Sequence, residues 1–167
     1  FMDYLQNGVP VRYFIEGKER NSIVYLIDYQ GVNRNDFYAV NQFTYIENGN
    51  QRRPDIVLFI NGLPLVLIEL KSPSKDDVGA ENAFHQIRNY MQDIPGIFYY
   101  NAVCVISDLS ANKAGTITSG FDRFMEWKTK DGDYENTALA QFDTFYEGIF
   151  QRERFLDILK NFICFSV

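Results

Sequence analysis

The stretch RPDIVLFINGLPLVLIELK, residues 53–71, predicts two adjoining β-strands in the middle of a sheet. Asn61-Gly62 stands between its two apolar runs, and this dipeptide favours a two-residue hairpin turn because both residues tolerate a positive φ. The second run, LPLVLIEL, is apolar on both faces, as is typical of strands that are covered on both sides. We therefore expect an antiparallel pair whose second strand lies at the centre of the sheet.

Charged residues stand at the open end of this predicted hairpin. Pro54-Asp55 precedes the first strand, and Glu69-Leu70-Lys71 ends the second. Because alternate residues of a strand share a face, we expect the Glu69 carboxylate and the Lys71 ammonium side by side. The returning strand can bring Asp55 near Glu69, which would assemble two carboxylates and the backbone carbonyl of Leu70. Mg²⁺ fits this set of oxygen ligands best.

The register of the hairpin adds a constraint. Directly opposed residues have a constant sum of residue numbers, and a two-residue Asn61-Gly62 turn makes that sum odd, whereas Asp55 and Glu69 give an even one. We therefore expect a three-residue loop or a β-bulge, which would allow these two carboxylates to face each other.

Such a site could hydrolyse a phosphodiester. A bound cation would polarise a phosphoryl oxygen and lower the pKa of a water molecule, while Lys71 would orient the nucleophile or neutralise developing charge. The alternative interpretation is a solvated pair of charges on an exposed strand end. The position of Glu69 and Lys71 at the end of the most apolar strand favours the catalytic interpretation, because unpaired charges are costly there.

Further strands are predicted from β-branched and aromatic residues. Asn21–Tyr29 and Asp36–Glu47 are expected to be adjacent strands joined by a polar turn, and Asn101–Ser107 is expected to be a short buried strand. A loop rich in Gly, Ser and Thr is predicted from there to Gly120.

Helices are predicted in the second half of the chain. One runs from about Asp77 to Asp93 and ends before Pro95-Gly96, with an inward stripe at Ala83, Ile87, Tyr90 and Ile94. A short helix is expected over Phe121–Lys128, and a long amphipathic segment over Leu139–Phe162. Strands followed by a helix, a strand and further helices predict an α/β fold with a mixed sheet.

Composition limits the possible functions. With 167 residues, 46% of them hydrophobic, we expect a single domain with one core. The net charge of −6 argues against a protein that holds nucleic acid by broad electrostatic attraction. No stretch approaches the roughly 20 apolar residues that span a bilayer, so no membrane association and a cytoplasmic location are expected. Cys104 and Cys164 stand alone in apolar contexts, which predicts two core thiols.

Four segments together resemble a known family. They are similar to the N-terminal endonuclease domain of type I restriction enzyme R subunits, within the PD-(D/E)xK nuclease superfamily: NDFYAVNQFT (35–44), RRPDIVLFINGLPLVLIELKSP (52–73), QIRNY (86–90) and NAVCVISD (101–108). The resemblance covers nearly the whole chain. It implies a restriction-endonuclease-like α/β fold with a mixed central sheet flanked by helices, formed by one domain over residues 1–167.

The resemblance also implies roles for individual residues. Asp55, Glu69 and Lys71 match the family's catalytic residues, with Mg²⁺ as the cofactor. Gln86 and Tyr90 match an accessory motif on the helix that follows, and their spacing of four places them on one helical face. The alternative for Gln86 is a core glutamine with satisfied hydrogen bonds.

Three neighbours of these motifs are less informative. Arg52 and Arg53 could contact a DNA phosphate that flanks the scissile bond, or could be solvated charges at the strand end. His85 is expected to be on the surface or partly buried, without a catalytic role.

Two features depart from the family pattern. The superfamily often adds an acidic residue from a helix before the first strand, but FMDYLQNG, residues 1–8, offers only a stub, so we expect that helix to be largely absent or to begin upstream. The chain has no GxxxxGK[ST] loop, so ATP would act only through motor domains that this chain lacks.

The function expected from the resemblance is cleavage of double-stranded DNA without sequence specificity of its own, after translocation by motor domains of the same polypeptide. Methyltransferase and specificity subunits would be further partners. The alternatives are another nuclease of the superfamily, such as a repair or junction-resolving enzyme, and an inactive domain that only docks or positions DNA.

Overall fold

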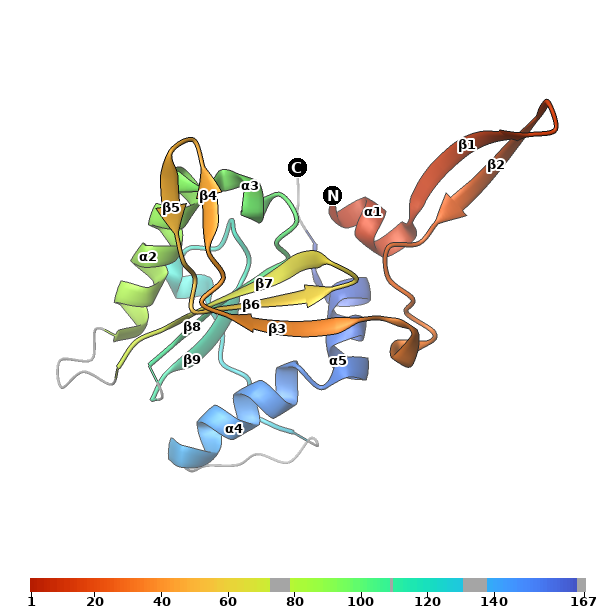
Figure 1. Ribbon diagram of the computed structural model, residues 1–167. Helices are drawn as coiled ribbons and strands as arrows, with labels where there is room; N and C mark the ends of the chain where they lie inside the picture. Colours follow the sequence, from red (N-terminus) through yellow and green to blue (C-terminus); the bar gives the residue numbers. More distant parts are fainter. Residues whose placement is uncertain (73–78, 109, 131–137, 165–167) are drawn as a thin grey trace.

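A mixed five-stranded sheet forms the centre of the molecule (Figure 1). The computed structural model describes residues 1–72, 79–108, 110–130 and 138–164. The strands run in the order β3 (Phe37–Asn41), β6 (Ile56–Ile60), β7 (Leu63–Leu70), β8 (Val103–Ser107) and β9 (Asn112–Gly115). Only β7 and β8 are parallel neighbours. The predicted mixed α/β architecture and the central place of residues 63–70 are confirmed.

The β6–β7 hairpin contains a β-bulge. Its turn is Asn61-Gly62, with φ of 51° and 81°, as expected for a two-residue turn. Phe59 pairs with Pro64, but Leu58 pairs with Val66, so the register shifts by one residue. The shifted register brings the residue before β6 opposite the last buried residue of β7. The predicted bulge is therefore confirmed.

Helices cover both faces of the sheet (Figure 1). On one face α2 (Gly79–Asp93) packs against Leu67 of β7 and Ile106 of β8. On the other face α4 (Ala138–Ile149) and α5 (Arg152–Asp157) pack against Ile68 and Val105, mainly through large apolar side chains: Phe145, Ile149, Phe155 and Leu156. Each central strand is thus buried on both sides, which explains its apolar sequence.

Helix α2 ends at Asp93, as predicted. Its expected inward stripe is buried, with at most 5% of any member exposed: Ala83, Ile87, Tyr90 and Ile94. Residues 77 and 78 of the prediction lie outside the described residues. Pro95 begins the short α3 (Pro95–Phe98) because a proline at the first helical position loses no hydrogen bond.

The predicted pairing of the two early strands is wrong. In the first region only Asn21–Val24 is strand, as the second half of β2 (Lys18–Val24), which pairs with β1 (Val9–Ile15) after the short α1 (Met2–Asn7). The second region divides into β3, which pairs with β6, and β4 (Tyr45–Glu47), which pairs with β5 (Asn50–Arg52). Strand propensity identified the segments, but the partner of a strand depends on contacts that are distant in sequence.

Three C-terminal predictions need correction. The predicted loop contains β9, whose polar residues pair at the edge of the sheet. Only Phe121–Arg123 forms a short 3₁₀ helix (η2) in the predicted helix. The long amphipathic segment divides into α4, α5 and a π-helix, η3 (Ile158–Phe162), because Gln151 caps a new helix by accepting a hydrogen bond from the Arg154 amide at 2.7 Å.

The two cysteines differ. Cys104 is buried, as predicted, whereas Cys164 is exposed, so the prediction of a core thiol is wrong there. Its neighbour Ile163 supplies the buried apolar side chain of this segment. Among the helices in the described parts of the chain, none is long and apolar enough to cross a membrane.

Because helices cover both faces of the sheet, an Ile→Ala substitution should lower the stability of the fold more at a buried strand position than at an exposed one. Ile106 is fully buried between β8 and α2, whereas Ile46 on β4 is 68% exposed. Ile106→Ala should lower the free energy of unfolding by about 2 to 5 kcal/mol because it leaves a cavity. Ile46→Ala should cost less than about 1 kcal/mol. Urea denaturation of both variants measures the difference, and equal costs would contradict the described packing.

Candidate active site

The Glu69 and Lys71 side chains lie side by side on the α2 face of the sheet. The Lys71 Nζ atom is 2.7 Å from Glu69 Oε1. The backbone amide of Lys71 donates to the Ser107 carbonyl at 2.8 Å, which holds the end of β7 against β8. Strand alternation therefore places the carboxylate and the ammonium together, with Leu70 facing the opposite way.

Asp55 joins these residues through two hydrogen bonds to its carboxylate. Its Oδ2 atom accepts from the Leu70 amide, and its Oδ1 atom accepts from Gln42 Nε2, both at 2.8 Å. Asp55 precedes β6, and its own carbonyl accepts from the Gln42 amide at 2.8 Å. These hydrogen bonds hold the Asp55 carboxylate beside the backbone of Leu70, the residue between Glu69 and Lys71.

The Glu69 carboxylate is nearly inaccessible to solvent, with 1% of the residue exposed. Burial raises the pKa of Glu69 to about 7, with a further rise from the nearby charge of Asp55, and the Lys71 ammonium opposes the shift. Its Oε1 atom binds Lys71, whereas its buried Oε2 atom makes no hydrogen bond of normal geometry within the described residues, although the Tyr90 hydroxyl is close enough to lower the pKa of this carboxyl slightly. A buried carboxylate oxygen without a donor is costly and requires an explanation.

Gln86 and Tyr90 of α2 extend the cluster. Gln86 Oε1 accepts from Lys71 Nζ at 2.7 Å, and Gln86 Nε2 donates to the Tyr90 hydroxyl at 2.5 Å. Burial raises the pKa of Tyr90, and the negative charges of Glu69 and Asp55 raise it further. The helical spacing of four thus brings both side chains to the end of strand β7, next to Glu69 and Lys71.

His85 and Arg52 point to other partners. His85 is exposed, as predicted, and its Nε2 atom lies 3.8 Å from Glu81 on the same helix. Arg52 on β5 binds the Asp93 carboxylate at 2.7 Å, which ties the β4–β5 hairpin to the end of α2. Arg53 is exposed.

Gln42 is a further residue of the site that the sequence did not predict. This residue directly follows β3 with φ of 53°, an uncommon conformation for a residue other than glycine, and directs its side-chain amide at Asp55. It stands 13 residues before Asp55, so neither strand alternation nor helical spacing relates the two. The sequence predicted one continuous strand over Asp36–Glu47, so it offered no signal for a turn at Gln42.

The residues present fit a magnesium ion. The carboxylates of Asp55 and Glu69 and the Leu70 carbonyl could hold it, and the unbonded Glu69 Oε2 atom would gain a partner. No cluster of three or more His, Cys, Asp or Glu side chains occurs in the described parts of the chain. Two carboxylates suffice for Mg²⁺, which retains several water ligands. A cleft of about 570 Å³ borders the site and is lined in part by Gln42, Asp55 and Lys71.

Comparison with known proteins decides the family. Residues 1–123 match the family model described as type I restriction enzyme R protein N terminus. This chain belongs to that family. The HindI endonuclease subunit of Haemophilus influenzae, a type I restriction enzyme subunit, is 35% identical over 99% of this chain and 16% of its own length.

Two further relatives agree. The EcoprrI endonuclease subunit of Escherichia coli, also of a type I restriction enzyme, is 31% identical over 98% of this chain and 51% of its own length. The MjaIXP protein of Methanocaldococcus jannaschii is 34% identical over 98% of this chain and 18% of its own length. The chain therefore spans less than a fifth of the length of two of these relatives.

Glu69 should make the stability of the fold depend on pH. Its pKa rises from 4.5 to about 7 on folding. Between these values the folded state holds a proton that the unfolded state has lost, so the free energy of unfolding falls as the pH rises, and levels off above pH 7. Glu69→Gln removes this penalty, and the variant should gain on the order of 1–3 kcal/mol relative to the parent across this window.

Urea denaturation with EDTA between about pH 5 and pH 8 measures this gain. Glu81→Gln is the matched control, because Glu81 is exposed on α2 and its exposed contact with His85 at 3.8 Å should change the pH profile by no more than about 0.5 kcal/mol. A Glu69→Gln profile parallel to that of the parent would contradict the raised pKa.

Proposed function

We propose that this chain is the endonuclease module of a type I restriction enzyme R subunit and hydrolyses phosphodiester bonds of double-stranded DNA with Mg²⁺. One observation carries the proposal: the buried Glu69 carboxylate has one oxygen bound to Lys71 and the other unbonded, with Asp55 beside it. A purely structural ion pair would be expected to satisfy both oxygens of so deeply buried a carboxylate.

Asp55, Glu69 and the Leu70 carbonyl are the proposed ligands of the metal. When bound, Mg²⁺ would polarise a phosphoryl oxygen and lower the pKa of a water molecule. Asp55 can hold its position without the metal, because the Leu70 amide and Gln42 each bind one of its oxygens. Such prior fixation lowers the cost of assembling the site around the scissile phosphate.

Lys71 is the proposed electrostatic partner of the phosphate. An ammonium has three N–H donors, and two of them bind Glu69 and Gln86. The third has no partner among the described residues and could bind an oxygen of the substrate, where the positive charge would neutralise charge that develops on the phosphorus oxygens. Gln86, held by Tyr90 in turn, fixes the direction of this ammonium.

DNA would reach this site through other parts of the assembly. The net charge of −6 is unsuited to strong non-specific DNA binding, which depends on many Lys and Arg contacts to phosphates. We propose that motor domains of the same polypeptide deliver the DNA and use the ATP, and that the methyltransferase and specificity subunits select the sequence. The Arg52 and Arg53 contacts to phosphate remain predictions.

Single substitutions at the site should separate cutting from translocation. In the full R subunit, assembled with its partner subunits, Glu69→Gln and Lys71→Met should each lower cleavage of a supercoiled plasmid at least about 100-fold. ATP hydrolysis and translocation should persist, because they belong to other domains. Glu81→Gln is the matched control and should cut normally. Cutting that survives at either position, or loss of all three activities together, would contradict the proposal.

The side-chain amides of Gln42 and Gln86, which bind Asp55 and Lys71, should act as positioning groups. Gln42→Leu and Gln86→Leu preserve side-chain volume but remove the hydrogen bonds to Asp55 and Lys71. Each should lower plasmid cleavage by the full subunit about 10- to 100-fold, as is typical of groups that orient metal ligands or their neighbours. The melting temperature should stay within a few degrees of the parent.

Gln92→Leu provides the control for these variants, because Gln92 is exposed on the same helix as Gln86. It should change neither cleavage nor melting temperature. Early melting of the Gln42 and Gln86 variants, or cleavage at the parent rate, would assign these two residues to the scaffold.

A further inference from the structure

A cleft leads from the candidate active site around the end of the sheet to the face that α4 covers. Asp55 and Lys71 line this cleft of about 570 Å³, and so do apolar side chains on the α4 side: Ile56, Leu70 and Phe142. Ile56 packs into the core under α4, and strand alternation turns Leu70 away from Lys71. A DNA strand with a phosphate at Asp55 and Lys71 would therefore have a neighbouring nucleoside beside this cleft.

The apolar side chains of the cleft are partly exposed. Leu70 is 37% exposed, although Leu65–Glu69 before it on β7 are all buried. The Phe142 ring is half-buried and lies against the Tyr146 ring, with 4.6 Å between the ring centroids. A flat apolar ligand that covered Leu70 and Phe142 would remove apolar surface from water directly beside the charged site.

The charge of the cleft suits a neutral ligand. Lys71 is the only cation among the described residues that line it, and Asp55 is the only anion. Its other polar groups are uncharged side chains: Asn41, Gln42, Ser72 and Ser107. Asn41 is exposed at the end of β3, and its amide can both donate and accept a hydrogen bond. A nucleobase, which is neutral and carries donors and acceptors on its edge, matches this lining better than a run of phosphates does.

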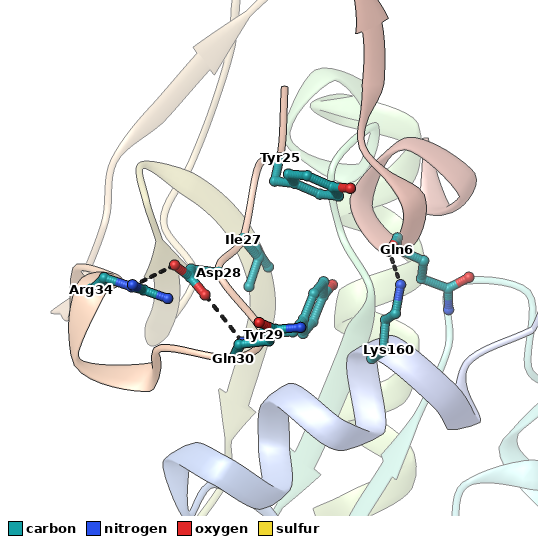
Figure 2. A pocket seen from close by; sticks show the side chains of 8 residues that line it. All are labelled: Gln6, Tyr25, Ile27, Asp28, Tyr29, Gln30, Arg34 and Lys160. Atoms are coloured by element: carbon teal, nitrogen blue, oxygen red, sulfur yellow. Dashed lines mark hydrogen bonds and ion pairs between the residues drawn. The ribbon is translucent and has the colours of Figure 1, made fainter. Parts of the chain in front are cut away.

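A second cleft, of about 610 Å³, lies at the root of the β1–β2 hairpin (Figure 2). Volume does not distinguish the two, because both fall within the range of about 300–1,000 Å³ that is typical of small-ligand sites. In the second cleft the Arg34 guanidinium binds Asp28 at 2.6 Å. The Asn61 side chain at the β6–β7 turn donates to the Leu26 carbonyl, beside this cleft, at 2.8 Å, whereas Asp55 precedes the other end of β6. A nucleoside held there would lie at the wrong end of the central hairpin.

We propose that the cleft beside the active site receives the nucleoside next to the scissile phosphate, with its base turned out of the duplex stack. The base would pack against Phe142 and Leu70, and Asn41 would bind its edge. Turning a base out costs free energy, which stacking on an aromatic ring partly returns. Such stacking tolerates any base, and the Asn41 amide can serve donors and acceptors alike, which suits cutting without sequence specificity. This inference rests on the proposed endonuclease function.

Variants at position 142 of the full R subunit, assembled with its partner subunits, test the stacking contact. Phe142→Leu keeps an apolar side chain but removes the ring, and should lower cleavage of a supercoiled plasmid about 5- to 100-fold. Phe142→Tyr keeps the ring and should restore most of the cleavage. Phe14→Leu is the control and should leave cleavage unchanged, because Phe14 is 67% exposed on the distant β1–β2 hairpin. Equal cleavage by the two variants at position 142 would overturn the proposal.

The parent subunit tests whether a base leaves the stack. Its substrates are a plasmid with a short unpaired loop and the same plasmid fully paired, and the cut ends are mapped by sequencing. Cut ends should fall at the loop several-fold more often than at the same positions of the paired plasmid, because an unpaired base leaves the stack at lower cost. Equal frequencies would mean that the bases stay stacked during cutting, and would overturn the proposal.

Photo-crosslinking separates this proposal from the catalytic one. A Glu69→Gln subunit is irradiated on plasmid DNA that carries 5-iodouracil in place of thymine, and crosslinked peptides are identified by mass spectrometry. The peptide that contains Phe142 should carry DNA, with a yield that falls several-fold when Phe142→Leu is added. A crosslink that is absent from this peptide, or unchanged by Phe142→Leu, would overturn the nucleoside site alone. A Glu69→Gln subunit that crosslinks as expected but still cuts would refute the catalytic site alone.

Discussion

One extra residue in the central hairpin determines which side chains meet at the candidate site. The β-bulge at Leu65 in β7 shifts the register, so that Ile56 pairs with Ile68 and Asp55 lies opposite Glu69. Without it, the two-residue Asn61-Gly62 turn would pair residues of odd number with residues of even number, and Asp55 would face a neighbour of Glu69. The hydrogen bond from the Leu70 amide to Asp55 depends on the same register.

Burial of the Glu69 carboxylate lowers the stability of the fold. This carboxylate is buried at the end of the apolar strand β7, and burial makes its ionised form unfavourable. The Lys71 ammonium offsets only part of this penalty, because one carboxylate oxygen remains unbonded. Groups that cost stability in this way are typical of functional sites, and the proposed Mg²⁺ would supply the partner that the carboxylate lacks.

Sequence patterns predicted the features that depend on neighbours along the chain. The hairpin turn, the alternation of Glu69 and Lys71, and the helical spacing of Gln86 and Tyr90 are local, and even the need for a bulge followed from residue numbers. The partner of β2, the edge strand β9 and the contact of Gln42 with Asp55 depend on which segments meet after folding. Their physical cause is tertiary packing, which strand propensity does not encode.

The most direct measurement of the central claim is an NMR titration of the Glu69 side-chain carboxyl with and without Mg²⁺. Without the metal, we predict a pKa of about 7 for this carboxyl. With saturating Mg²⁺, the pKa should fall by more than about one unit, because a bound cation favours the ionised carboxylate. Asp55→Asn should weaken this response. A pKa that is raised but indifferent to Mg²⁺ would contradict a metal site at Asp55 and Glu69.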